Sequence, residues 1–128
     1  MVTGRTPGGS RTAKAQVRVR RVYDTPATDD GTRVLVDRLW PRGLSKQAAD
    51  LDMWLRDVAP STDLRKWYSH NPAKFGEFSR RYRQELSQPP ALDALAQVRA
   101  MASKGQVTLL TATKDAAHSE AAVLADMV

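Results

Sequence analysis

Cysteine is absent from this 128-residue chain, which therefore forms no disulfide, holds no thiolate-bound metal and has no cysteine nucleophile. Histidine occurs only twice, at His70 and His118, and this spacing does not match a metal site. No apolar run approaches the roughly 20 residues that cross a membrane, and no hydrophobic signal segment opens the chain. We therefore expect a cytoplasmic protein that makes no membrane contact and holds no metal.

The net charge of +6 comes entirely from the start of the chain. Residues 1–23 contain six basic and no acidic side chains, whereas residues 24–128 contain 14 of each. A domain that binds duplex DNA usually presents a basic face that releases phosphate counterions. Because the body of this chain is neutral, its high isoelectric point does not by itself predict nucleic-acid binding.

The sequence divides into a short polar arm and one domain. Residues 1–15 are rich in glycine, threonine and serine and too polar to bury a core, so we expect a disordered basic arm. Residues 16–128 fit the usual size of one domain, roughly 100–150 residues. A chain of this length can bury a core without disulfide or metal support.

Three segments have the pattern of β-strands. Residues 17–22 alternate apolar and polar side chains, which indicates a strand with one buried face. Residues 33–37 and 107–111 contain nearly continuous apolar runs, as in strands that are buried on both faces. Residues 51–58 are ambiguous, because their pattern fits a short strand or a helix.

Helical signals separate these strands. Ser45 is placed to cap a short helical turn, and residues 60–63 offer caps for a short helix. A longer helix opens at Pro72, an amphipathic helix precedes Gly105, and a last helix begins near His118. The expected buried positions of these three helices are Phe75, Phe78, Tyr82, Leu86, Leu92, Leu95, Val98, Met101, Ala121, Leu124 and Val128.

Strands that alternate with helices, and whose central members are continuously apolar, predict an α/β fold. The expected architecture is a single-domain sandwich in which a small, partly parallel central sheet is flanked by helices. In open sheets of this kind, ligands favour the crevice at the carboxyl ends of the strands.

Two polar segments lie at those strand ends, residues 37–43 and residues 111–115. Arg38 and Arg42 have the guanidinium geometry that suits bidentate recognition of phosphate or carboxylate. Lys114 precedes a helix N-terminus, where free main-chain N–H groups favour an anion. The two segments together predict an anion site.

The same residues also have a structural interpretation. Asp37 and Arg38 can form an ion pair that ties the strand to its loop, and Trp40 can pack in the core rather than stack on a base. The cluster of Arg80, Arg81 and Arg83 is typical of a solvated helix face, and a nucleic-acid patch is its less common interpretation.

No motif identifies a reaction, since the nucleophile elbow, the zinc-protease helix, the dinucleotide turn and the Walker loop are all absent. The candidates for proton transfer are Asp24, Asp37 and His70, because carboxylates and imidazole act as general acids and bases. The sequence identifies no cofactor and no oligomeric state.

Several strings of this sequence match those of a known family. Tyr23-Asp24, the string VDRLWPRG at residues 36–43, residues 64–67 and Lys114-Asp115 resemble the YeaO-like family, domain of unknown function 488. The resemblance covers about residues 17–127 and implies a small cytosolic bacterial or archaeal α/β domain with no established reaction. The family's motif positions fall here on Tyr23, Asp24, Asp37, Arg38, Trp40, Pro41, Arg42, Gly43, Arg65, His70, Lys114 and Asp115.

Three positions depart from that family's pattern. The family often has tyrosine, alanine and asparagine where this chain has Thr111, Thr113 and Ser119. If these side chains line a pocket, this chain binds a different ligand from its relatives, or none.

We therefore expect a site for an anionic small molecule, a nucleotide or phosphorylated metabolite, at the strand ends, with catalysis left open. The alternative is a nucleic-acid-binding or regulatory module that uses the basic arm and Arg80, Arg81 and Arg83. A third interpretation is an adaptor that binds another protein. The residues expected to bind the ligand are Tyr23, Arg38, Trp40, Arg42, Lys114 and Asp115.

Overall fold

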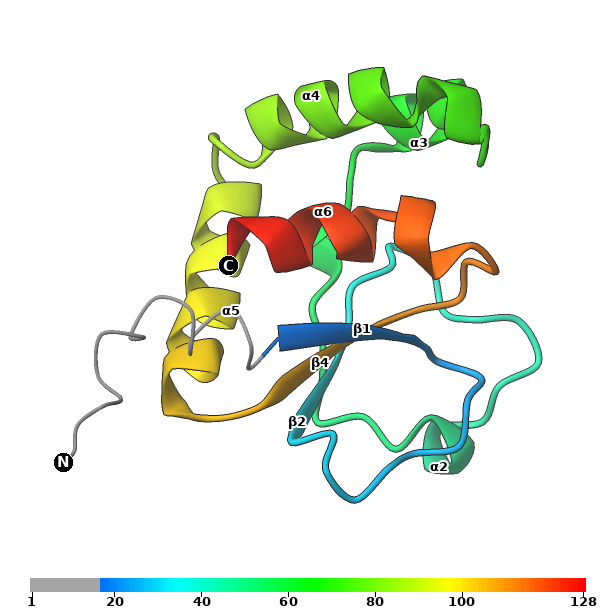
Figure 1. Ribbon diagram of the computed structural model, residues 1–128, viewed down its shortest axis with the longest axis vertical. Helices are drawn as coiled ribbons and strands as arrows, with labels where there is room; N and C mark the ends of the chain where they lie inside the picture. The colour runs from blue at the N-terminus through cyan, green and yellow to red at the C-terminus, as the bar shows by residue number, and fades with distance from the viewer. Residues whose placement is uncertain (1–16) are drawn as a thin grey trace, which may run out of the picture.

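The computed structural model describes residues 17–128, so the predicted basic arm of residues 1–15 lies outside the described residues. The first two strands follow one another along this part of the chain, and helices separate the later strands (Figure 1). The strands are β1 (Val17–Arg21), β2 (Thr32–Leu35), β3 (Met53–Trp54) and β4 (Val107–Thr111). The α-helices are α2 (Lys46–Ala49), α3 (Thr62–Tyr68), α4 (Phe75–Glu85), α5 (Ala91–Lys104) and α6 (Glu120–Met127). Short 3-10 helices are η2 (Arg56–Val58), η3 (Pro72–Lys74) and η4 (Ala116–His118).

The four strands form one sheet in the order β1-β4-β2-β3, and every pair in it is parallel. The predicted α/β class is confirmed. The expectation of a partly parallel sheet is sharpened, because the described sheet contains no antiparallel pair. The paired strands β2 and β3 are joined by residues 36–52, and β3 is joined to β4 by residues 55–106, which are the long connections that parallel pairing requires.

The two faces of the sheet are covered differently. Val34 and Leu109 face the main core, where they meet Phe78, Leu95 and Leu124 from α4, α5 and α6. The opposite face carries a smaller core of Val22, Leu35, Ala49 and Leu110, covered by α2 and by the loops on either side of it. In Figure 1, α4 and α6 lie above the sheet and α2 lies below it. Helices therefore flank the sheet mainly on one face.

The predicted caps begin two of the helices. The Ser45 hydroxyl accepts a hydrogen bond from the Ala48 N–H at 3.0 Å, and the Ser61 hydroxyl accepts one from the Leu64 N–H at 3.1 Å. These bonds satisfy N–H groups that have no partner inside a first helical turn. Residues 51–58, which the sequence left ambiguous, form β3 followed by η2.

The expected buried stripes are confirmed in α4, where Phe78 and Tyr82 are buried, and differ in α5. Leu92 is 39% exposed, so its expected place in the core is wrong. The buried positions of α5 are Ala94, Leu95, Val98 and Ala102. These residues follow the four-residue spacing of one helix face, and Leu92 lies to one side of that face. No helix within residues 17–128 is both long and apolar enough to cross a membrane.

A buried ionic cluster lies near the amino-terminal edge of the sheet, just before β2. Asp30 is 1% exposed and accepts hydrogen bonds from the Ala27 N–H and from three guanidinium groups, those of Arg18, Arg20 and Arg33. Burial raises the pKa of Asp30, but the Ala27 N–H and the Arg20 and Arg33 guanidinium groups outweigh burial and lower the pKa to about 2. We call Arg18, Arg20, Asp30 and Arg33 the amino-edge cluster.

Arg33 is the most enclosed cation of this cluster, at 5% exposure. Besides Asp30, its guanidinium group donates to the carbonyl groups of Ala49 and Asp50, both at 2.8 Å. Gly31 passes beside it with φ of 66°, and a Cβ atom there would lie 2.1 Å from the Gln106 carbonyl oxygen. This turn therefore requires glycine, and it directly follows Asp30 of the amino-edge cluster.

Candidate functional site

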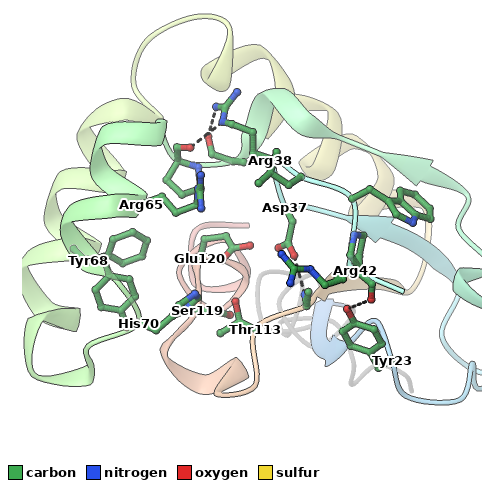
Figure 2. A pocket seen from close by; sticks show the side chains of 17 residues that line it. Tyr23, Asp37, Arg38, Arg42, Arg65, Tyr68, His70, Thr113, Ser119 and Glu120 are labelled. Atoms are coloured by element: carbon green, nitrogen blue, oxygen red, sulfur yellow. Dashed lines mark hydrogen bonds between the residues drawn. The ribbon is translucent and has the colours of Figure 1, made fainter. Parts of the chain in front are cut away.

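A pocket of about 480 Å³ lies at the carboxyl ends of β2 and β4 (Figure 2). This is the position at which open parallel sheets usually bind ligands. The segment that follows β2, the loop before α3, helix α3 itself and the first turn of α6 supply its walls. The lining residues are Tyr23, Asp37, Arg38, Leu39, Trp40, Pro41, Arg42, Ala59, Pro60, Arg65, Tyr68, His70, Phe78, Ala112, Thr113, Ser119 and Glu120.

The pocket brings together most of the residues singled out from the sequence and leaves three outside its lining. The residues brought together are Tyr23, Asp37, Arg38, Trp40, Arg42 and His70. Asp24, Lys114 and Asp115 are exposed and do not line the pocket. The Asp115 carboxylate instead lies 2.7 Å from Nδ1 of His118.

Asp37 ties the end of β2 to the end of β4. One carboxylate oxygen accepts a hydrogen bond from the Thr111 hydroxyl, and the other accepts one from the Ala112 N–H, both at 2.8 Å. Its carbonyl oxygen accepts a third bond from Nε1 of Trp54, at 2.7 Å. Asp37 is thus fixed by β4 and β3 and not by an ion pair with Arg38.

Glu120, the first residue of α6, lies beside Asp37 on the floor of the pocket. The Thr111 hydroxyl lies 3.4 Å from one of its carboxyl oxygens. Burial raises the pKa of Glu120 well above its usual range, and the hydrogen bond and negative charge of Asp37 raise it further. The carboxyl groups of Asp37 and Glu120 thus meet at the Thr111 hydroxyl, and we call these two residues the carboxyl pair.

Arg38 holds a wall of the pocket. Its guanidinium group donates to the carbonyl oxygens of Ala59 and Pro60, both at 3.2 Å. These two bonds fix the start of the loop that leads into α3. They use part of the donor capacity of Arg38 and leave its positive charge at the pocket.

Arg65 and Arg42 approach the carboxyl pair from opposite sides, as Figure 2 shows. Arg65 extends from α3, and its Nε atom is buried without a hydrogen-bond partner. The carbonyl oxygen of Arg42 accepts a hydrogen bond from the Tyr23 hydroxyl at 2.8 Å. Neither guanidinium group forms a hydrogen bond or an ion pair with another residue of the described chain.

Aromatic side chains complete the walls. The Tyr68 hydroxyl donates to the His118 carbonyl oxygen at 2.6 Å, and the Tyr68 ring stacks on Phe78 at 4.2 Å. Burial raises the pKa of Tyr68, and the charges of Asp115 and Glu120 add to that rise. His70, with a φ of 56°, follows at the exposed end of α3.

Trp40 borders the pocket and also packs in the smaller core, as its structural interpretation predicts. Its Nε1 atom donates to the Leu44 carbonyl oxygen at 2.7 Å, and its ring meets the edge of Trp54 at 5.3 Å. These contacts fix the orientation of the ring. Stacking of Trp40 on a base stays a prediction.

Within residues 17–128, no three histidine, aspartate or glutamate side chains are grouped so that they could hold a metal ion. The carboxyl pair supplies two carboxyl groups only, and Thr111 is the hydroxyl nearest to both. The charged side chains at this site can recognise a charged ligand and exchange protons.

Sequence reasoning did not single out Glu120, Tyr68 and Ser119 as binding residues, and it placed Arg65 only among family motif positions. Ser119 and Glu120 could have been found as pocket residues from their position, because they lie at the start of the helix that follows the strand-end loop. Thr113 and Ser119, two of the three departures from the family pattern, do line the pocket.

Comparison with known sequences places this chain among uncharacterised bacterial proteins. The family model described as "Inactive DUF488-N3 subclade" matches residues 16–128. Uncharacterised proteins of Mycobacterium tuberculosis and Mycobacterium bovis are 47% identical over 115 residues, which cover 90% of this chain and 95% of each relative. The uncharacterised protein YeaO of Escherichia coli is 40% identical over 111 residues, which cover 86% of this chain and 94% of that protein. No solved structure matches the chain significantly.

Proposed function

Since the chain belongs to the YeaO-like DUF488 family, in a subclade described as inactive, we propose that it binds an anionic small molecule in the strand-end pocket without turning it over. The ligand class is a nucleotide or another phosphorylated metabolite. The observation that carries this proposal is the pair of unpartnered guanidinium groups, Arg42 and Arg65, on opposite sides of one cavity.

The energetics favour an anion in this cavity. A buried N–H group without a partner, such as Nε of Arg65, costs free energy that an incoming acceptor recovers. Guanidinium groups bind phosphate oxygens through charge-assisted, often bidentate hydrogen bonds. The charge of Arg38 on the third wall adds to the attraction.

The contacts of Arg80, Arg81 and Arg83 argue against the alternative of a nucleic-acid-binding module. Arg80 and Arg81 both bind the Glu77 carboxylate, and Arg83 binds the Asp126 carboxylate at 2.9 Å. These contacts neutralise much of the cluster that the alternative requires. The basic arm, its other component, lies outside the described residues.

A thermal-shift screen tests the proposal with phosphate, pyrophosphate, nucleoside phosphates and sugar phosphates. A ligand at about 100 times its Kd adds roughly 2.7 kcal/mol of stability, so one phosphorylated compound should raise Tm clearly. We expect Arg65→Ala and Arg42→Ala each to remove that shift. Arg80→Ala is the matched control, because it removes an exposed arginine outside the pocket and should leave the shift unchanged. The proposal fails if no anion raises Tm, or if both pocket variants keep the shift.

A further inference from the structure

The strand-end pocket has a negative floor between its positive walls. The carboxyl pair lies in the middle of the cavity, with Arg65 to one side and Arg42 to the other (Figure 2). Neither Asp37 nor Glu120 forms an ion pair with a described arginine. The charges of the pocket are therefore separated rather than mutually neutralised.

The two members of the carboxyl pair differ in how firmly they are held. Both Asp37 oxygens accept short hydrogen bonds, from Thr111 and Ala112, which fix the position of its carboxyl group. The same Thr111 hydroxyl lies farther from Glu120, at 3.4 Å. Two adjacent carboxylates repel each other, and this repulsion adds to burial in raising the pKa of Glu120.

A cation that binds both carboxyl groups can relieve the repulsion between them. An ammonium group brings a full positive charge and three donors, so it can bind Asp37 and Glu120 together and remove their repulsion. A neutral hydroxyl donates one bond but leaves the repulsion in place. Charge complementarity therefore favours a cationic group at the floor and an anionic group at the arginines.

We propose that the ligand of this pocket is a primary amine that also carries a phosphate or similar anion, with the amine bound by Asp37 and Glu120 and the anion bound by Arg65 and Arg42. This inference rests on the proposed function and adds that the anionic ligand carries a primary amine at its other end. An ammonium ion bound beside Glu120 lowers the raised pKa of that carboxyl group, so a proton that Glu120 carries leaves to solvent, and the ammonium keeps its own three protons. The titratable and charged groups that surround the pair are Arg38, Arg42, Arg65, Tyr68, His70 and Tyr82.

A matched set of ligands tests the inference on the unaltered protein. The probes are aminoalkyl phosphonates with two, three and four methylene groups, each compared with the alkyl phosphonate of the same length. Calorimetry at pH 6, in two buffers of different ionisation enthalpy, gives both the affinity and the number of protons released. We expect one aminoalkyl phosphonate to bind at least about tenfold more tightly than its partner, as a charge-assisted hydrogen bond supplies. We also expect it to release more protons than its partner, because the bound ammonium lowers the raised pKa of Glu120.

The variant Glu120→Gln removes the titratable carboxyl group and keeps the shape of the side chain. In this variant, the tenfold advantage of the aminoalkyl phosphonate over its alkyl partner and the difference in proton release should both disappear. If the two ligands of each pair bind the wild type equally and release equal protons, the inference is overturned and the anion site stands. If neither ligand binds, or if Arg65→Ala does not weaken binding, the proposed function fails together with the inference.

Discussion

The two ends of the sheet use the same residue types in opposite ways. At the amino edge, Asp30 accepts hydrogen bonds from three arginines and a main-chain N–H group, and Arg33 also donates to two carbonyl groups. At the carboxyl edge, Asp37 binds main chain and Thr111, while the guanidinium groups of Arg42 and Arg65 have no partner among residues 17–128. A buried charge with all of its partners stabilises the fold, whereas charges held near each other without partners are available to a ligand.

Removal of the Asp30 charge should cause the largest loss of stability. Asp30→Asn leaves Arg18, Arg20 and Arg33 facing one another without their shared anion, and breaking a buried ion pair costs about 3–5 kcal/mol. Urea unfolding at pH 7, followed by circular dichroism, measures the change in the free energy of unfolding. Glu77→Gln is the matched control, because Glu77 also pairs with two arginines but lies on the surface, and its loss should be much smaller. Equal losses in the two variants would mean that burial of Asp30 is not what makes the amino-edge cluster stabilising.

The contributions of Asp30 and Glu120 to the free energy of unfolding should change with pH in opposite directions. The pKa of Asp30 is lowered to about 2, so its contribution to stability is present above pH 4 and is lost as the pH falls toward 2. The pKa of Glu120 is raised, so its contribution is present in acid and is lost as the pH rises through the raised pKa.

Urea unfolding of the wild type and two variants from pH 3 to pH 9 separates these effects. Asp30→Asn should flatten the loss of stability on the acid side. Glu120→Gln should gain stability relative to the wild type as the pH rises, because the ionised form of Glu120 is disfavoured in the folded protein. A difference between the two proteins that is the same at pH 4 and pH 9 would contradict the raised pKa of Glu120.

Substitution of a pocket arginine should change stability less. Arg65→Met keeps an apolar stem and removes a guanidinium group that has no partner, so we expect the free energy of unfolding to stay within about 1 kcal/mol of the wild type. Arg33→Met, the matched change at the amino edge, should lower it by several times as much, because it leaves Asp30 short of a buried partner. If Arg65→Met destabilises the protein as strongly as Arg33→Met, the pocket arginine stabilises the fold as much as the amino-edge cluster does, and the contrast between the two edges is wrong.

The smallest effect is expected at Lys114. The sequence placed this residue in the anion site, but it is exposed and does not line the pocket. Lys114→Ala should therefore change the affinity for the best anion of the screen by less than about twofold, since a surface charge near a site is worth little. Titration calorimetry of the variant beside Arg65→Ala measures this difference directly.

The fold was largely predictable, because the signals that specify it are local. Apolar runs gave the strands, and Ser45 and Ser61 marked the starts of α2 and α3. Local signals also explain the wrong prediction at Leu92. The three-residue spacing from Leu92 to Leu95 indicates one buried face, but the buried face of α5 leaves Leu92 exposed. The all-parallel pairing required knowledge of which strands are neighbours, and no local pattern contains it.

The site was predictable only where the chain brings strand ends together. Arg38, Trp40 and Arg42 follow a buried strand directly and could be assigned to that edge. Glu120 looks like an ordinary acidic residue in a first helical turn, and its burial depends on how α6 packs on β1 and β4. Asp30 looks like a turn residue, and its role depends on arginines from two different strands.

The order of the strands also determines when the sheet can form during synthesis. β4 lies between β1 and β2 and is the last strand to leave the ribosome, about 90 residues after β1. Until it emerges, β1 has no strand to pair with, and β2 can pair only with the two residues of β3. The nascent chain thus carries open strand edges through most of its translation, the stage at which such chains aggregate or recruit chaperones. The pocket floor needs β4 and α6, so it can form only after these two elements have been synthesised.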